Sequence, residues 1–157
     1  MSKLQLKNFF KAAYDLMLVL LQFFIISLHF FQWEFLPQKQ IIQASPYSYF
    51  LGILIIIIAF KIMLVSIKDL GRNLSPFPRP INNSNLVTTG IYRFTRHPMY
   101  YSLIFISIGV FLIKLSIYYL FLTISLALII KFKIALEEKY LINKFKNYLL
   151  YKNEVKV

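Results

Sequence analysis

One long apolar stretch constrains the fold more than any other part of the sequence. Met99 to Ile130 is 32 residues long and holds a single charged residue, Lys114. A membrane span needs roughly 20 apolar residues, so this stretch is too long for one helix and slightly short for two. We therefore predict a tight helical hairpin that turns near Lys114 and Ser116. Two earlier apolar stretches, Ala12 to Trp33 and Tyr47 to Ile67, predict two further spans.

The composition of the chain agrees with a membrane protein. Its 157 residues are 59% hydrophobic and 15% charged, whereas soluble domains carry roughly 25% charged residues. We predict an all-α integral membrane protein with about four transmembrane helices, the last two a tight hairpin, followed by a cytoplasmic C-terminal helix. A cleaved signal peptide is the competing interpretation of residues 1–33. The apolar core there is too long for one, and no small-x-small cleavage site directly follows it.

The distribution of basic residues predicts the topology. The net charge is +12, but the basic residues flank apolar stretches and do not form a patch on a soluble fold, so we predict no nucleic-acid partner. Sixteen of the 18 basic residues fall on one side of the predicted spans, and only Lys39 and Lys114 fall on the other. Basic residues favour the cytoplasmic side. We predict a single membrane domain over residues 1–157, multi-pass, with both termini cytoplasmic and two spans within residues 1–67.

Several chemistries are excluded by residues that the sequence lacks. It contains no cysteine, which excludes disulfides, thiolate catalysis and cysteine-based metal sites. Two histidines and six acids leave too few ligands for a zinc site, so we predict no metal. The four glycines form neither a GxGxxG fingerprint nor a P-loop.

All of the arginines lie in one predicted loop, between residues 72 and 96, which contains no lysine. They are Arg72, Arg79, Arg93 and Arg96. A guanidinium group suits bidentate binding of carboxylate or phosphate. Lipid headgroups are equally good partners for the first two. The last two stand beside a His-Pro pair, where binding of a ligand or a structural ion pair is the better interpretation.

A pair of adjacent acids, Glu137 and Glu138, follows the last predicted span by about one helical turn. An acid near the membrane interface is costly unless it is paired, so both are candidates for function. The alternative is a salt bridge to the loop arginines or to neighbouring lysines. Glu138 falls in the apolar stripe of a predicted tail helix that begins after Ile130. The stripe consists of Ile134, Glu138, Leu141, Phe145 and Tyr148.

Further polar residues mark the start of the third span and one face of the first. Pro98 keeps His97 out of the helical region and can itself open a helix, so His97 should precede the third span directly. A structural hydrogen bond is the alternative role for His97. Asp15, Gln22 and His29 recur every seven residues in the first span. Contact with other helices is the main interpretation, and a proton relay is the alternative.

Four segments over residues 70–151 resemble one known family when taken in order. They are LGRNLSPFPRP, LVTTGIYRFTRHPMY, ALEEKYL and FKNYLLY. Together they resemble the isoprenylcysteine carboxyl methyltransferases and their phospholipid-methyltransferase relatives, small integral membrane enzymes that use S-adenosylmethionine. The resemblance covers the C-terminal half and implies that residues 68–157 form the cofactor-binding methyltransferase half.

The resemblance also implies roles for individual residues. The implied cofactor-binding residues are Leu86 and Val87 through their backbone, Tyr92, His97, Pro98, Met99, Tyr100 and Glu137. The charges of the cofactor add Glu138, because either acid of the pair suits its ammonium group or ribose hydroxyls. Arg96 and Lys133 are the catalytic candidates. The charge of the cofactor carboxylate, and not the resemblance, suggests Arg96 or Arg93 as its partner. Lys133 stands where eukaryotic members place an arginine that faces the substrate carboxylate. A lysine ammonium is a point charge, whereas an arginine guanidinium can form two parallel hydrogen bonds to a carboxylate.

The function that the resemblance implies is methyl transfer from S-adenosylmethionine to an amphiphilic, lipid-like acceptor that enters from the bilayer. A prenylcysteine-type carboxylate or a similar group is the leading acceptor, and a phospholipid amine is the first alternative. Membrane sterol-type reductases share a related C-terminal pattern and use a nicotinamide, but they are much longer. A non-catalytic membrane protein that binds lipid is the remaining alternative.

Overall fold

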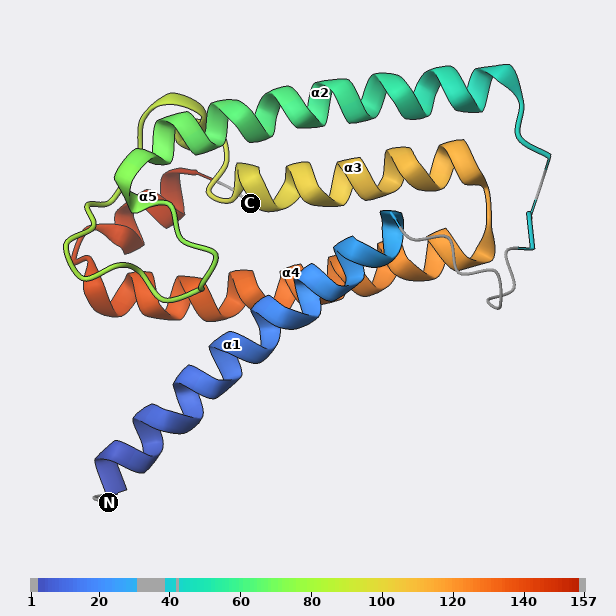
Figure 1. Ribbon diagram of the computed structural model, residues 1–157. Coiled ribbons are helices and arrows are strands. Elements are labelled where there is room, and N and C mark those ends of the chain that lie inside the picture. The colour runs from blue at the N-terminus through green and yellow to red at the C-terminus, as the bar shows by residue number, and fades with distance from the viewer. Residues whose placement is uncertain (1–2, 31–38, 42, 156–157) are drawn as a thin grey trace.

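The computed structural model describes residues 3–30, 39–41 and 43–155 (Figure 1). Its helices are α1 (Lys3–Phe30), α2 (Pro46–Leu70), η1 (Gly71–Asn73), η2 (Gly90–Arg93), α3 (Pro98–Lys114), α4 (Ile117–Lys144) and α5 (Tyr148–Glu154). Among the described residues, extended pairing is limited to one isolated bridge between Gln40 and Ser116. The prediction of an all-α fold is confirmed.

Three of the described helices, α1, α2 and α4, are long and apolar enough to cross a membrane. The fourth apolar helix, α3, has 17 residues and rises about 25 Å, less than the roughly 30 Å hydrocarbon core. The apolar stretch was expected to be slightly short for two full spans. In the structure α3 is the helix that is too short, because α4 continues without a break to Lys144. The predicted end of the first span, Trp33, lies outside the described residues.

The hairpin turns at the predicted place. Leu115 adopts a left-handed conformation with φ of 42° directly after α3. Ser116 then caps α4, because its hydroxyl accepts a hydrogen bond from the Tyr118 backbone at 3.3 Å. The Leu115 carbonyl in turn accepts one from the Ile41 backbone at 2.7 Å. The segment before α2 is thereby fastened to the turn.

Helices α2, α3 and α4 run alongside one another, and α1 crosses α4 obliquely (Figure 1). The α2–α3 contact is close because glycines face each other across it. A Cβ atom on Gly109 would lie 2.5 Å from the Ile56 side chain and 2.8 Å from the Gly52 carbonyl oxygen. Small residues let two membrane helices approach at backbone distance. These two glycines therefore set the spacing between α2 and α3.

We expect Gly109→Val to lower the free energy of unfolding by about 1–3 kcal/mol, because the added carbons force α3 away from α2. Thermal unfolding of detergent-purified protein would measure the effect. Ala12→Val, at an exposed position of α1, is the matched control and should leave stability unchanged. An equal loss in both variants would contradict the assigned contact.

The polar residues of α1 meet other parts of the protein, as predicted. Asp15 and Gln22 are both buried, and His29 is partly buried. Their partners are Arg79 and Tyr140 for Asp15, Lys133 for Gln22, and Ser107 for His29. Each of these polar groups thus has a hydrogen-bonding partner in the protein, which compensates for the hydrogen bonds to water that it loses on burial.

The tail differs from the prediction of one helix that carries the stripe through Tyr148. Helix α4 runs from the membrane span to Lys144, where Phe145 becomes extended with φ of −114° and ψ of 112°. The chain then turns back into α5. This reversal buries Tyr148 and Tyr151 against neighbours that include Leu86, which a continuous helix would carry away from the bundle. Helix α5 therefore lies beside the end of the bundle that carries the loop between α2 and α3 (Figure 1).

Candidate functional site

A turn at Gly90 positions the loop between α2 and α3 against the helix bundle. Gly90 has φ of +62°, and a Cβ atom there would lie 2.1 Å from Asp69 Oδ2. The same oxygen accepts a hydrogen bond from the Ile91 backbone at 2.8 Å. Only glycine fits such a conformation beside a carboxylate. Asp69 thus fastens the turn to the end of α2, and η2 brings Tyr92 into the interior.

The His-Pro pair opens α3 as predicted. Pro98 is the first residue of the helix, and His97 precedes it in a non-helical conformation. The His97 ring is buried and stacks on Tyr100, with ring centroids 5.8 Å apart. Its Nε2 atom lies 3.4 Å from Glu138 Oε1 and makes no well-formed hydrogen bond. His97 is therefore held in place mainly by contacts of its ring.

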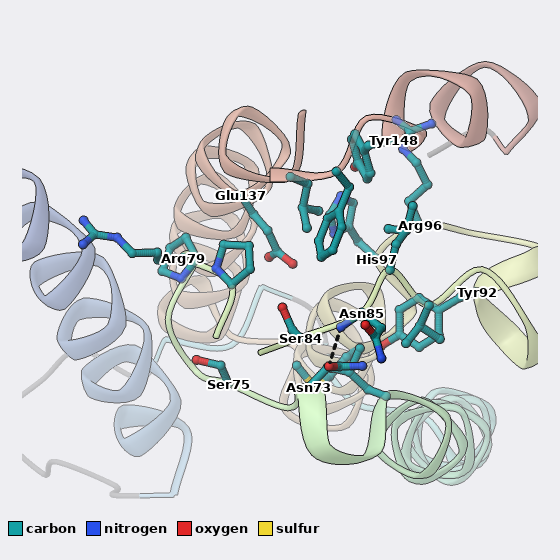
Figure 2. Close-up of a pocket in the computed structure, with 18 of the residues that line it drawn as sticks. Asn73, Ser75, Arg79, Ser84, Asn85, Tyr92, Arg96, His97, Glu137 and Tyr148 are labelled. Carbon is teal, nitrogen blue, oxygen red and sulfur yellow. Dashed lines mark hydrogen bonds between the residues drawn. The ribbon is translucent and has the colours of Figure 1, made fainter. Parts of the chain in front are cut away.

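One cavity gathers most of the predicted site residues (Figure 2). Its volume is about 90 Å³. It lies between the loop after α2, the start of α3, the end of α4, and α5. The predicted residues that line it are Leu86, Val87, Tyr92, Arg96, His97, Met99, Tyr100 and Glu137. Pro98, Lys133 and Glu138 do not line it.

Glu137 presents its carboxylate to the cavity (Figure 2). The Tyr100 hydroxyl lies within hydrogen-bonding reach of this carboxylate, and the side chains of His97 and Lys133 interact with it electrostatically. A partly buried carboxylate is stable only where donors or a cation face it. The position suits a ligand that carries an ammonium group or hydroxyls.

Glu138, the second acid of the pair, is engaged in a structural network. Arg96 reaches its Oε1 atom with Nε at 3.0 Å and Nη2 at 2.9 Å, and Lys152 reaches Oε2 at 2.6 Å. Arg96 Nη1 also donates to the backbone carbonyls of Lys152 and Val155. The guanidinium therefore extends toward α5 (Figure 2). For Glu138, the structure therefore shows the alternative role that the sequence left open, a salt bridge to a loop arginine.

Lys133 lies behind the cavity wall and is only 1% exposed. Its ammonium group donates to the Gln22 side chain and, at 3.0 Å, to the Pro76 carbonyl. It also lies 5.2 Å from the centre of the Tyr100 ring, a cation–π distance. The resemblance implies that Lys133 faces a substrate carboxylate. In the structure its ammonium group instead binds other groups of the protein.

Sequence reasoning missed the tyrosines of the C-terminal segment as lining residues. Tyr148 and Tyr151 both line the cavity, although the helical stripe predicted Tyr148 only as part of an apolar face. The Tyr148 hydroxyl is buried without a hydrogen-bonding partner. Burial, with the nearby Glu138 charge, raises the pKa of Tyr148 above its usual range. This hydroxyl stays protonated and is available as a donor.

Tyr151 and Tyr92 join α5 to the glycine turn. The Tyr151 hydroxyl donates to the Tyr92 carbonyl at 2.6 Å. Burial raises the pKa of Tyr151 to about 12. The pKa of Tyr92 is raised above its usual range by burial and by the Glu137 charge. Both rings therefore remain neutral and offer aromatic surface to the cavity. The motif FKNYLLY, which contains Tyr148 and Tyr151, was the sequence feature that could have indicated their place in the site.

Sequence reasoning also missed the residues that follow α2 as lining residues. Polar residues from this loop line the cavity beside its prolines. They are Asn73, Ser75, Arg79, Ser84 and Asn85. The Asn73 side chain accepts a hydrogen bond from the Asn85 backbone at 3.1 Å (Figure 2), which brings the two ends of the loop together. The Arg79 guanidinium points away from the cavity toward α1 and pairs with Asp15 at 3.1 Å.

The charges and surfaces of the cavity define the ligand that it suits. Among the described residues that line it, the cations are Arg79 and Arg96, and both are already paired with acids of the protein. Glu137 supplies the carboxylate. Several of the remaining lining residues are aromatic. The cavity therefore suits a ligand that combines a cationic or hydroxyl-bearing part with a flat ring.

Comparison with known proteins places these residues in a family. Residues 47–148 match the family model described as phospholipid methyltransferase. The chain is also 34% identical over 113 residues to the protein-S-isoprenylcysteine O-methyltransferase of Saccharomyces cerevisiae. That alignment covers 68% of this chain and 46% of the yeast protein, so this chain spans about half the length of its relative. The family match includes the glycine turn, the His-Pro pair and Glu137. The chain belongs to the phospholipid methyltransferase family.

Proposed function

We propose that this protein is a membrane methyltransferase that uses S-adenosylmethionine and acts on a lipid-like acceptor. The observation that carries the proposal is the Glu137 carboxylate, which faces a cavity lined mostly by the segment that matches the family. The asymmetry of basic residues supports a multi-pass arrangement with both termini in the cytoplasm. The cavity would then open at the cytoplasmic face of the membrane.

The residues that line the cavity fit the chemical groups of S-adenosylmethionine. Glu137 suits its ammonium group or ribose hydroxyls, and the unpartnered Tyr148 hydroxyl supplies a buried donor. The Tyr92 ring offers a face for adenine. The backbone of Leu86 and Val87 supplies further polar groups beside it. When bound, this cofactor supplies a methyl group on a positively charged sulfur for direct transfer.

The protein contributes binding, orientation and exclusion of water. The Tyr100 hydroxyl, within hydrogen-bonding reach of the Glu137 carboxylate, orients it, and His97 stacks on the Tyr100 ring. Apolar side chains also line the cavity, among them Phe77 and Phe145, and they would help to keep water from the reacting groups. Holding two reactants in line accounts for a large part of the rate of such a transfer. A dry site also favours a reaction in which opposite charges neutralise each other.

The acceptor has two candidates, each with its own support. A prenylcysteine-type carboxylate is supported by the likeness to the yeast protein, whose name describes O-methylation of isoprenylcysteine. A phospholipid amine is supported by the position of Lys133. Its ammonium lies outside the cavity and is bound to Gln22 and Pro76, so a carboxylate acceptor would find no free cation there. An amine needs none.

Calorimetry on detergent-purified protein tests the cofactor. We expect S-adenosylmethionine and S-adenosylhomocysteine to bind and NADPH not to bind. No binding of either adenosyl compound at millimolar concentration would refute the proposal, and binding of NADPH alone would favour a reductase. A methyl-labelled donor offered with a prenylcysteine analogue or with phosphatidylethanolamine vesicles then identifies the acceptor.

A further inference from the structure

One wall of the cavity is a proline-rich segment that lacks regular secondary structure. We call residues 75–80 the proline loop, and five of its six residues line the cavity. Pro76, Pro78 and Pro80 have no backbone N–H group, so they cannot donate to a hydrogen-bonded turn. Within the loop, the Phe77 backbone donates to the Ser75 hydroxyl at 3.1 Å. The shape of this wall therefore depends on contacts with the elements around it.

The first such contact runs from α1 through a buried lysine. Gln22 of α1 accepts a hydrogen bond from the Lys133 ammonium, which also donates to the Pro76 carbonyl at 3.0 Å. Gln22 is 6% exposed and Lys133 1% exposed. A buried ammonium must keep its acceptors, so removing either one disturbs the other. The chain Gln22–Lys133–Pro76 thus ties the start of the proline loop to α1.

The second contact joins α1 to the loop directly. Asp15 is 3% exposed and pairs with the Arg79 guanidinium at 3.1 Å. The Tyr140 hydroxyl also donates to Asp15 at 3.2 Å, and the Arg79 guanidinium lies 5.4 Å from the centre of the Tyr140 ring. Arg79 is thereby drawn away from the cavity, while its backbone stays in the wall (Figure 2).

The helix that makes both contacts lies outside the region shared with the family. The match covers residues 47–148, whereas α1 is Lys3–Phe30. Asp15 and Gln22 stand seven residues apart on one face of α1. Asp15 pairs with Arg79 of the proline loop directly, whereas Gln22 is linked to Pro76 through Lys133. His29, seven residues further, contacts Ser107 of α3 at 2.7 Å. It anchors α1 without touching the loop.

We propose that α1 positions the proline loop, with Gln22 and Asp15 as positioning residues that act through Lys133 and Arg79. Helix α1 thereby sets the shape of the cavity wall. The consequence for cofactor affinity rests on the proposed function, but the contact between α1 and the loop does not. Lys133, in this arrangement, serves the loop and not the acceptor. The α1 helix becomes part of the site although none of its described side chains lines the cavity.

Spin labelling tests this arrangement without any ligand. The chain contains no cysteine, so Phe77→Cys accepts a single nitroxide on the proline loop. Asn83→Cys accepts one on the following segment, which Lys144 holds from α4 through the Ser84 hydroxyl at 2.7 Å. Electron paramagnetic resonance spectra in detergent then report the motion of each segment.

We expect Gln22→Leu to increase nitroxide motion at position 77 and to leave position 83 unchanged. Gln22→Glu keeps an acceptor for the ammonium and should behave as the parent protein does. Asp15→Asn should increase motion at position 77 by a smaller amount, because Arg79 is 45% exposed in its side chain and such pairs are weak. His29→Leu removes an anchor of α1 that lies away from the loop and is the matched control.

A double variant keeps the test decisive if Gln22→Leu alone fails to fold. Combining Gln22→Leu with Lys133→Met removes the buried ammonium together with its side-chain acceptor, so no buried charge is left without its partner, the most costly outcome. It should mobilise position 77 fully. Unchanged motion there in the double variant would overturn the proposal. Motion that rises in the double variant but not in Gln22→Leu would overturn the role of Gln22.

Cofactor affinity supplies a second readout. A loop that must become ordered on binding lowers the apparent affinity, so the double variant should bind S-adenosylmethionine about 3- to 10-fold more weakly. His29→Leu should bind it normally. If the parent protein does not bind it, the proposed function is wrong, while the spectra still decide whether α1 holds the loop. If affinity is unchanged although the loop is mobile, the loop does not shape the site.

Discussion

Replacing Glu137 by glutamine is expected to weaken binding of S-adenosylmethionine about 10- to 100-fold, which is the loss of a hydrogen bond to a charged group. The carboxylate faces the cavity with the Tyr100 hydroxyl beside it. Glutamine keeps the size of the side chain and one acceptor oxygen but removes the charge. Because Glu138 carries the structural ion pairs, thermal stability should change little. Calorimetry measures the affinity, and thermal unfolding checks the fold.

Two comparisons make this result specific to Glu137. Glu154→Gln changes an exposed acid on α5 that lies outside the cavity, and it should bind the cofactor as the parent protein does. His97→Ala should also weaken binding, because the ring stacks on Tyr100 and interacts electrostatically with Glu137. Normal affinity in both Glu137→Gln and His97→Ala would show that the site is wrongly placed, even though the family is right.

Replacing Arg96 by methionine is expected to lower the free energy of unfolding by about 3–5 kcal/mol, the usual cost of removing one partner of a buried ion pair. Arg96 and Glu138 are 7% and 11% exposed in their side chains. The change also deprives the carbonyls of Lys152 and Val155 of their donor, so the C-terminal segment should detach. Unfolding by SDS in mixed micelles measures the loss.

Arg93→Met is the matched control for this prediction. Arg93 lies three residues earlier and is exposed, so its replacement should change stability by less than about 0.5 kcal/mol. A double-mutant cycle with Glu138→Gln isolates the interaction between Arg96 and Glu138. Similar small effects at both arginines would mean that the network contributes nothing to stability, and that Arg96 is free to bind the carboxylate of the cofactor.

Much of the fold follows from local features of the sequence. The hairpin near Lys114 and Ser116 was predictable because a stretch of that length cannot remain one helix in a bilayer. The start of α3 was predictable because proline restricts the residue before it, whatever the rest of the protein does. The polar face of α1 was expected to contact other helices, but the residues that it contacts were not predicted. Burial demands a partner, and only the fold selects which one.

The functions of adjacent charged residues were not predictable to the same degree. Glu137 and Glu138 are identical in type, yet one faces the cavity and the other holds α5 through Arg96. Successive positions on a helix are rotated by about 100°, so their surroundings depend on what packs against each face. Lys133 shows the same limit. Its position suggested a substrate contact, while a glutamine on a helix far away in the sequence and a proline carbonyl occupy its ammonium.

The sequence by itself determined the membrane character, the approximate number of spans, the hairpin and the family motifs, because these depend on hydropathy, charge and residue type within short windows. The tertiary structure alone decided which side chains share the cavity, that the chain reverses after Lys144, and that α1 contacts the proline loop. The physical reason is that these features depend on contacts between residues far apart in sequence. Buried charges and hydroxyls take the partners that the assembled helices bring within reach.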